Sequence, residues 1–275
     1  MHERLFLTDA DNTLWDTDAV YRNAQLALLG EAEAEVGREA QTADRLAFLR
    51  ELDQLLAQRH HSGLRYPPAL LVRAVKTRLQ GARPDQAIRV ALREDASDNG
   101  EHQDILQVFF TNLGKLAPLR LGVVEGLTKL ASAGQQIVIA TEGPKEKIES
   151  ILAAHGLSAH AHSVLSAAKG PPLYLRLAKT SSGLKMMVGD QLDRDIEPAK
   201  AAGFVTAWFP GGFTPRWSTS GSEAADLEVS SFEEAADAFL RLSQESRPPK
   251  RSVARGSSPR QQVGGRRRGQ RASLP

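Results

Sequence analysis

Residues 5–13 read Leu-Phe-Leu-Thr-Asp-Ala-Asp-Asn-Thr, so an apolar run that suits a buried strand ends in two carboxylates one residue apart. Side chains two apart on an extended segment project to the same side, which places Asp9 and Asp11 in one small volume. Two anions about 4 Å apart repel by about 4 kcal/mol at an effective dielectric of about 20, so a cation must lie between them or one must stay protonated. The pair therefore predicts a chemical site at the end of a strand, the edge at which open α/β sheets bind ligands.

The composition indicates a globular protein whose metal and catalytic chemistry must use oxygen and nitrogen. The 275 residues are 41% hydrophobic and 25% charged and include no cysteine, which excludes disulfides, thiolate nucleophiles and cysteine-bound metals. No apolar run approaches the ~18 residues of a membrane span, and too few residues precede the first predicted strand for a signal peptide. We therefore expect no membrane partner and, by default, a cytoplasmic location.

The net charge of +2 averages two unlike regions. Residues 244–275 carry nine basic side chains and one acidic side chain, whereas residues 1–243 carry 26 basic and 32 acidic ones. The C-terminal stretch is rich in Ser, Gly, Pro, Arg and Gln and has few large apolar side chains, so it cannot offset the entropy lost on ordering. We expect residues 244–275 to form a disordered basic tail.

The chain between the first strand and Pro118 has the periodicity of helices. Apolar residues recur at the spacing of one helix face at positions 49, 52 and 56, at 71, 75 and 79, and at 105, 109 and 113. Gly, Pro, Ser and Asn interrupt the pattern near residues 63–68, 81–84 and 97–100. These features predict an all-helical cap domain at residues 16–117.

After Pro118 the pattern alternates between strand and helix. Strands are expected at 136–140, near 164, at 184–188, at 204–208 and around 227–229, with helices at 123–133, 145–154, 192–202 and 231–243. Such alternation favours parallel strands covered by helices on both faces. We therefore predict an α/β fold, a three-layer α/β/α Rossmann-like core made of residues 1–15 and 118–243 and interrupted by the helical cap.

Chemically active side chains follow four of the predicted strands. They are Asp9 and Asp11 after the first, Thr141 after the second, Lys169 after the weaker strand near 164, and Asp190 with Asp195 after the strand at 184–188. Because parallel strands end at one edge, these residues should converge there. A nucleophile, an acid/base, a hydroxyl, an ammonium and ligands for a hard divalent cation together suit phosphoryl transfer through an enzyme carboxylate.

In this order and spacing the residues resemble the haloacid dehalogenase (HAD) superfamily of hydrolases, in particular its phosphatase branch with a helical cap. Residues 9–14 match the first motif, Thr141 the second, Lys169 the third and residues 189–195 the fourth. The third motif lacks the usual acidic residue after the lysine, so Lys179 and Lys185 remain alternatives to Lys169. The dehalogenases of the superfamily attack carbon and lack an acid at the position of Asp11, so the resemblance favours phosphate ester chemistry.

The resemblance implies a role for each matching residue. Asp9 would attack phosphorus to give an aspartyl phosphate, and Asp11 would protonate the leaving oxygen and then activate water. Thr141, the amides near Glu142 and Lys169 would hold the phosphoryl oxygens. The implied ligands of Mg²⁺ are the carboxylates of Asp9 and Asp190 and the backbone carbonyl of Asp11, with Asp195 orienting Lys169 or a metal-bound water.

The implied substrate is a small phosphorylated metabolite, and Trp15, directly after the first motif, is our candidate for a substrate contact from the cap side. A phosphomutase on the same core is an alternative, because it would use the same motifs. A non-catalytic protein that binds nucleic acid or an acidic partner through the basic tail is another. We expect no nucleic-acid partner beyond that alternative, since Arg-rich tails without interleaved aromatics are more often solvated extensions. Neither the ester nor the oligomeric state follows from the sequence.

Overall fold

The computed structural model describes residues 4–63, 66–93, 102–211 and 224–245. The tail was predicted to begin at residue 244, but the last described helix continues to Glu245. Residues 246–275 and the predicted break at 97–100 lie outside the described residues. In the described ranges, every helix is too short or too polar to cross a membrane.

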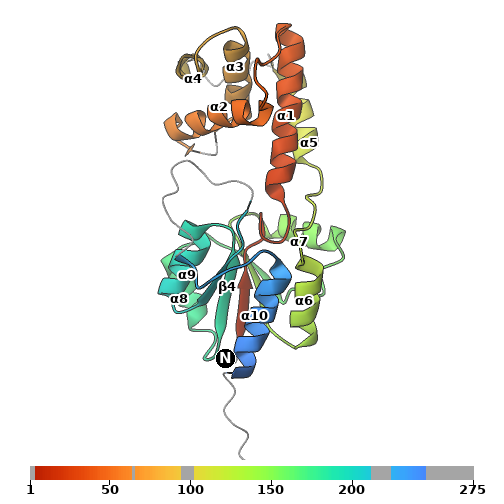
Figure 1. Ribbon diagram of the computed structural model, residues 1–275, viewed down its shortest axis with the longest axis vertical. Helices are drawn as coiled ribbons and strands as arrows, with labels where there is room; N and C mark the ends of the chain where they lie inside the picture. Colours follow the sequence, from red (N-terminus) through yellow and green to blue (C-terminus); the bar gives the residue numbers. More distant parts are fainter. Residues whose placement is uncertain (1–3, 64–65, 94–101, 212–223, 246–275) are drawn as a thin grey trace, which may run out of the picture.

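A parallel sheet organises the lower half of the molecule as drawn in Figure 1. Its six strands lie in the order β3-β2-β1-β4-β5-β6, so the first strand of the chain is central. β1 pairs in parallel with β2 on one side and with β4 on the other. The strands are β1 (Leu5–Thr8), β2 (Ile137–Thr141), β3 (Ser163–Ser166), β4 (Lys185–Gly189), β5 (Val205–Trp208) and β6 (Leu227–Glu228).

Helices cover both faces of this sheet, which confirms the predicted three-layer α/β/α fold. Phe6 of β1 faces a core shared with α6 (Val123–Ser132), α7 (Lys145–Ala154) and α10 (Phe232–Glu245). Leu5 and Leu7 face the opposite core, with α8 (Pro171–Ala178) and α9 (Glu197–Ala201). The alternation follows from the two-residue period of a strand, and it fixes β1 so that the residue after Thr8 emerges at the C-terminal edge.

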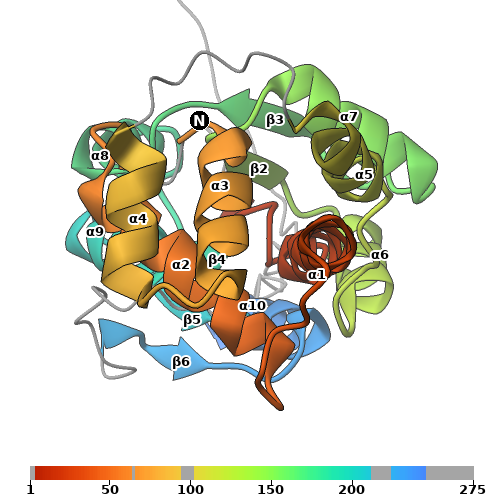
Figure 2. The ribbon, with the colours of Figure 1, turned by 90° about the horizontal axis from the view of Figure 1, so that it is seen from above.

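Five helices lie above that edge (Figures 1 and 2). Their apolar side chains form a core of their own. The helices are α1 (Thr17–Val36), α2 (Arg45–Arg59), α3 (Pro68–Leu79), α4 (Pro84–Arg93) and α5 (Gln103–Leu113). The Asp16 carboxylate caps α1 by accepting from the amide of Ala19 at 2.8 Å, and Gly37 ends the helix in the left-handed conformation at φ 68°. These five helices occupy the stretch in which the sequence predicted a helical cap, and we call them the cap.

The two chain crossings between the sheet and these helices run side by side. The amide of Asp16 donates to the carbonyl of Pro118 at 2.8 Å, and the amide of Arg120 donates to the carbonyl of Leu14 at 3.0 Å. Trp15 and Leu119 form an antiparallel bridge between these two bonds. The entry to and the exit from the helical part are thereby tied together next to the first motif.

One predicted element has a different form. Residues 192–202 were expected to form one helix, but a π-helix at Leu192–Ile196 precedes α9. Pro198 lies in the first turn of α9 and has no amide hydrogen, so a regular ladder of backbone bonds could not pass through it. Single-turn π-helices often occur at functional sites, and this one carries Asp195.

Candidate active site

Asp9 lies at the C-terminal end of the central strand, and the backbone holds it there. Its amide extends the parallel ladder by donating to the carbonyl of Val188 at 2.9 Å. The Thr13 hydroxyl donates to Oδ2 of Asp9 at 3.1 Å. The side chain is almost fully buried, so the carboxylate is shielded from bulk water by the residues around it.

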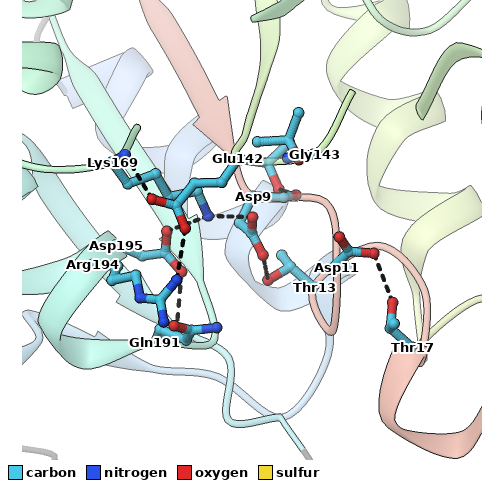
Figure 3. A network of polar contacts seen from close by, with 12 residues as sticks. Asp9, Asp11, Thr13, Thr17, Glu142, Gly143, Lys169, Gln191, Arg194 and Asp195 are labelled. Carbon is cyan, nitrogen blue, oxygen red and sulfur yellow. Dashed lines mark hydrogen bonds and ion pairs between the residues drawn. The ribbon is translucent and has the colours of Figure 1, made fainter. Parts of the chain in front are cut away.

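Lys169 is the lysine that the structure brings to this carboxylate (Figure 3). Its Nζ contacts Oδ1 of Asp9 and lies 2.7 Å from Oδ1 of Asp195. Lys185, by contrast, begins β4 at the opposite end of the strand, where its Nζ donates to the carbonyl of Gly183 at 3.2 Å. Lys179 ends α8. Of the three candidate lysines, Lys169 is therefore the one that contacts Asp9.

Burial and mutual repulsion set the protonation of these groups. Burial raises the pKa of Asp9 above its ordinary value, although the adjacent Lys169 ammonium opposes the shift. Burial likewise raises the pKa of Asp190, and the charges of Asp9 and Asp195 raise it further. Burial disfavours the ammonium form of Lys169, but Asp9 and Asp195 outweigh this effect and raise its pKa. The cluster thus holds one ammonium group, which stays charged, and three carboxyl groups, which a single positive charge cannot neutralise when all are ionised.

The acids at this edge fit a hard divalent cation. Asp9, Asp190 and Asp195 offer carboxylate oxygens that all lie within 4.8 Å of one another, and among the described residues no other group of three or more potential ligands does so. The Oδ1 atom of Asp190 is buried without a hydrogen-bond partner. Because a buried acceptor without a partner is costly and Mg²⁺ prefers oxygen ligands, this oxygen is suited to bind a metal ion.

Close backbone packing places Asp195 next to Lys169. A Cβ atom at Gly189 would lie 2.4 Å from Cβ of Asp195, so only glycine permits this approach. The amide of Gln191 donates to Oδ2 of Asp195 at 3.2 Å, while Oδ1 accepts from Lys169. Asp195 is fully buried and contacts Lys169, one of the two groups that the resemblance implies it orients.

Thr141 and Glu142 follow β2 at the same edge. The Thr141 hydroxyl oxygen accepts from the amide of Gly143 at 3.0 Å, so its hydrogen remains available for a ligand. The Glu142 carboxylate accepts from the amide of Lys169 at 3.1 Å and from the Arg194 guanidinium at 2.6 Å. Figure 3 shows Glu142 spanning the loops after β3 and β4. Its side chain joins loops, and the phosphate contact predicted near Glu142 concerns its backbone amide.

Asp11 points away from Asp9, toward the start of α1 (Figure 3). Its Oδ1 accepts from the Thr17 hydroxyl at 2.7 Å and from the Trp15 indole at 3.0 Å. Trp15, expected to contact the substrate, is fully buried and holds the Asp11 carboxylate. Trp15 also lines a cavity together with Asp11 and Thr17, and its contact with the substrate stays a prediction.

Three residues of the site had no role assigned from the sequence, although Thr13 and Arg194 lie within the first and fourth motifs. Thr13 binds Asp9, Arg194 pairs with Glu142, and the Arg120 guanidinium donates to the carbonyl of Asn12. Arg120 and Asn12 are 108 residues apart, and an arginine within a loop has no periodicity that could reveal such a contact. Asn12 itself, at φ 58°, fits the tolerance of Asn for left-handed turns.

Residues 3–203 match the family model of the haloacid dehalogenase-like hydrolases, and the chain therefore belongs to this family of hydrolases. This confirms the resemblance inferred from the four motifs. No curated protein matches the chain.

Several solved structures share the fold at low sequence identity. A haloacid dehalogenase-like hydrolase from Xanthomonas campestris is 19% identical, with a TM-score of 0.58 over 89% of this chain and 98% of that one. The HAD-hydrolase YfnB from Bacillus subtilis, bound to magnesium, is 18% identical, with a TM-score of 0.54 over 87% and 100% of the two chains. A predicted phosphoglycolate phosphatase from Haemophilus somnus is 18% identical, with a TM-score of 0.52 over 89% and 99%. At such identities the likeness concerns the fold.

Proposed function

We propose that this HAD-family hydrolase is a Mg²⁺-dependent phosphatase that cleaves a small phosphorylated metabolite through an aspartyl-phosphate intermediate. The observation that carries the proposal is the convergence of Asp9, Lys169, Asp190 and Asp195 at one sheet edge, with one buried oxygen of Asp190 lacking a partner.

Asp9 is the proposed nucleophile. One of its carboxylate oxygens forms a bond to phosphorus while the ester P–O bond breaks, which leaves a phosphoryl group on Asp9. The Thr13 hydroxyl and the Lys169 ammonium, which contact the two oxygens of Asp9, hold the carboxylate in one orientation. Fixing the nucleophile in this way lowers the entropic part of the barrier.

Asp11 is the proposed acid and base. It gives a proton to the leaving ester oxygen, then takes a proton from the water that attacks the aspartyl phosphate and releases inorganic phosphate. To do so, its carboxylate must turn from Thr17 and Trp15 toward the leaving group. This turn breaks the hydrogen bond between Asp11 and Thr17, the first residue of α1.

Thr141 and Lys169 are the proposed contacts of the phosphoryl oxygens. The Thr141 hydroxyl hydrogen is free to donate, and the charge of Lys169 offsets that of the phosphoryl group. Asp9, Asp190 and the backbone carbonyl of Asp11 are the proposed ligands of Mg²⁺. When bound, the cation would neutralise the acids and stabilise the negative charge that moves with the phosphoryl group.

The direct test is hydrolysis of an aryl phosphate by the wild type, with and without MgCl₂. We expect phosphate release that needs Mg²⁺ and that falls to background in Asp9→Asn, because an amide cannot form the intermediate. The matched control is Asp53→Asn, which changes a buried carboxylate of the cap. Activity without added metal after chelation, or activity in Asp9→Asn equal to wild type, would end the proposal. A panel of phosphorylated metabolites then addresses specificity, which the fold cannot decide.

A further inference from the structure

Arg120 joins the exit of the helical part to two loops of the active site. Its guanidinium donates to the carbonyl of Asn12 and to the carbonyls of Phe209 and Pro210, the latter two at 3.1 and 2.7 Å. It also stacks on the Phe209 ring, with its central carbon 3.4 Å from the ring centroid. One side chain thus bonds to the loop that follows Asp11 and to the loop that follows β5.

The last residue of β5 and the three residues after it, 208–211, form a wall behind Asp190. The Trp208 indole donates to the backbone carbonyl of Asp190 at 2.8 Å, and the amide of Phe209 donates to the carbonyl of Gly189 at 2.9 Å. A Cβ atom at Gly211 would lie 2.7 Å from Oδ2 of Asp190. The position of the Asp190 carboxylate therefore depends on where residues 208–211 lie.

From these contacts we infer that Arg120 is a positioning residue, which fixes Asp190 and the backbone at Asn12 in the arrangement that binds the divalent cation. The inference rests on the proposed function only in taking Asp190 as a metal ligand. Arg120 does not contact the ligand oxygens; it holds in place the backbone carbonyls behind them. This arrangement is the kind of outer support that commonly tunes a metal site.

The three carbonyls require the shape of a guanidinium. Arginine presents a rigid planar fork of five donors that can also stack on an aromatic ring, whereas lysine presents one compact ammonium on a flexible stem. Arg120→Lys therefore keeps the charge but cannot reproduce bonds to Asn12, Phe209 and Pro210 together with the stacking. Arg120→Met keeps much of the apolar stem and loses both charge and bonds.

The experiment measures Mn²⁺ binding by isothermal titration calorimetry on the full-length protein, with no substrate present. We expect Arg120→Met and Arg120→Lys to raise the dissociation constant for Mn²⁺ by about 10-fold or more. Losses of this size are typical when residues that support a metal ligand are removed. The control is Arg78→Met in the cap, because Arg78 is also half-buried, donates to a carbonyl at 2.9 Å and lies 5.6 Å over the Phe48 ring. Loss of a stacked guanidinium from the cap should lower Tm without changing Mn²⁺ binding.

A second variant reaches the same wall without touching Arg120. Gly211→Ala would push a methyl group toward Asp190 and should weaken Mn²⁺ binding in the same direction, so the inference stays testable even if the Arg120 variants fold poorly. Wild-type Mn²⁺ affinity in folded Arg120→Met, or in Arg120→Lys, would overturn the positioning role of the Arg120 guanidinium. Wild-type affinity in Gly211→Ala would overturn the role of the wall.

The outcome also separates this inference from the proposed function. If the wild type binds Mn²⁺ and the Arg120 variants bind it more weakly, the inference holds even when no phosphate ester is hydrolysed. If the wild type hydrolyses esters with Mg²⁺ while Arg120→Met keeps wild-type Mn²⁺ affinity, the proposed function holds and the inference fails. A wild type that binds no Mn²⁺ would overturn the inference.

Discussion

The cap and the sheet each bury a carboxylate, and the two are satisfied in opposite ways. In the cap, Asp53 accepts hydrogen bonds from the hydroxyls of Tyr66 and Tyr21 and from the side-chain amide of Gln25. Burial raises the pKa of Asp53, which these neutral donors partly oppose. The carboxylate has partners for both oxygens, so its burial is explained by the packing of the cap alone.

At the sheet edge, Asp190 is buried beside two other acids and keeps one oxygen without a partner. The comparison teaches that burial of a carboxylate does not by itself identify a site. What distinguishes the edge is that three carboxyl groups surround a single lysine and that one carboxylate oxygen has no hydrogen-bond partner. Substitutions at the sheet edge should therefore lower activity, whereas substitutions around Asp53 should lower stability.

The largest difference should appear in kcat/KM. We expect Asp9→Asn to lower kcat/KM for an aryl phosphate by at least about a thousandfold, because it removes the nucleophile itself. Asp53→Asn should stay within about threefold of wild type, since the amide oxygen can still accept from Tyr66. Steady-state kinetics on both variants, with circular dichroism to check folding, measures the contrast. Comparable losses in the two variants would erase the distinction between the clusters.

The next largest effect should be on the metal. Asp190→Asn removes a charge from the proposed ligand set and should weaken Mg²⁺-dependent activity so that half-saturation needs about 10- to 100-fold more Mg²⁺. Titration of MgCl₂ at fixed substrate gives the value. Asp53→Asn is again the control, and an unchanged half-saturation in Asp190→Asn would remove Asp190 from the metal site.

In the cap, the expected effect is on stability. Tyr66→Phe removes a buried hydroxyl that donates to Asp53 and should lower the free energy of unfolding by about 1–3 kcal/mol, because the acceptor loses a partner. Urea unfolding followed by circular dichroism measures this loss, and kcat/KM at a temperature where the variant is folded should not change. A large drop in kcat/KM at unchanged stability would instead place the Tyr66–Asp53 pair in the catalytic part.

The smallest expected effect is a pH dependence of the stabilisation by Mg²⁺. Folding raises the pKa of Asp9 and Asp190 above the ordinary 3.8, so the metal-free protein holds protons more tightly than the unfolded chain. Stability from these groups is present at low pH and is lost as pH rises from the ordinary value through the raised one. Mg²⁺ binds the ionised carboxylates, so its stabilisation should grow over the same interval.

Thermal unfolding with and without MgCl₂ checks this dependence. The gain in Tm should be larger at pH about 8 than at pH about 5.5 by a few degrees, about the shift expected for 1–2 kcal/mol in a chain of this size. Asp190→Asn should show a smaller gain at both pH values. An equal gain in Tm at the two pH values would contradict the raised pKa values.

The sequence predicts the sheet and the edge well because both depend on local patterns. Residues 5–8 and 137–141 are short apolar runs followed by Asp9 and by Glu142, so strand ends and polar residues coincide in the sequence. Parallel pairing then brings these ends together whatever their separation along the chain.

The parts that the sequence did not reveal depend on close approach in space. The orientation of Asp11 is set by Thr17 and by the buried Trp15, and nothing in the spacing of these residues fixes a rotamer. The π-helix before α9 replaces the regular helix that the apolar spacing suggested. Arg120 acts through carbonyls of Asn12 and Phe209, and a contact with a backbone atom leaves no mark on the residue type of its partner.

The most direct test of the central claim is to trap the phosphorylated enzyme. Wild-type protein turning over an aryl phosphate with Mg²⁺ is quenched in acid, digested and examined by mass spectrometry for a phosphoryl group on the peptide that contains Asp9. We predict that this peptide gains one phosphoryl group in the wild type and none in Asp9→Asn. A phosphoryl group on another residue, or steady hydrolysis without any covalent phosphate, would contradict the account.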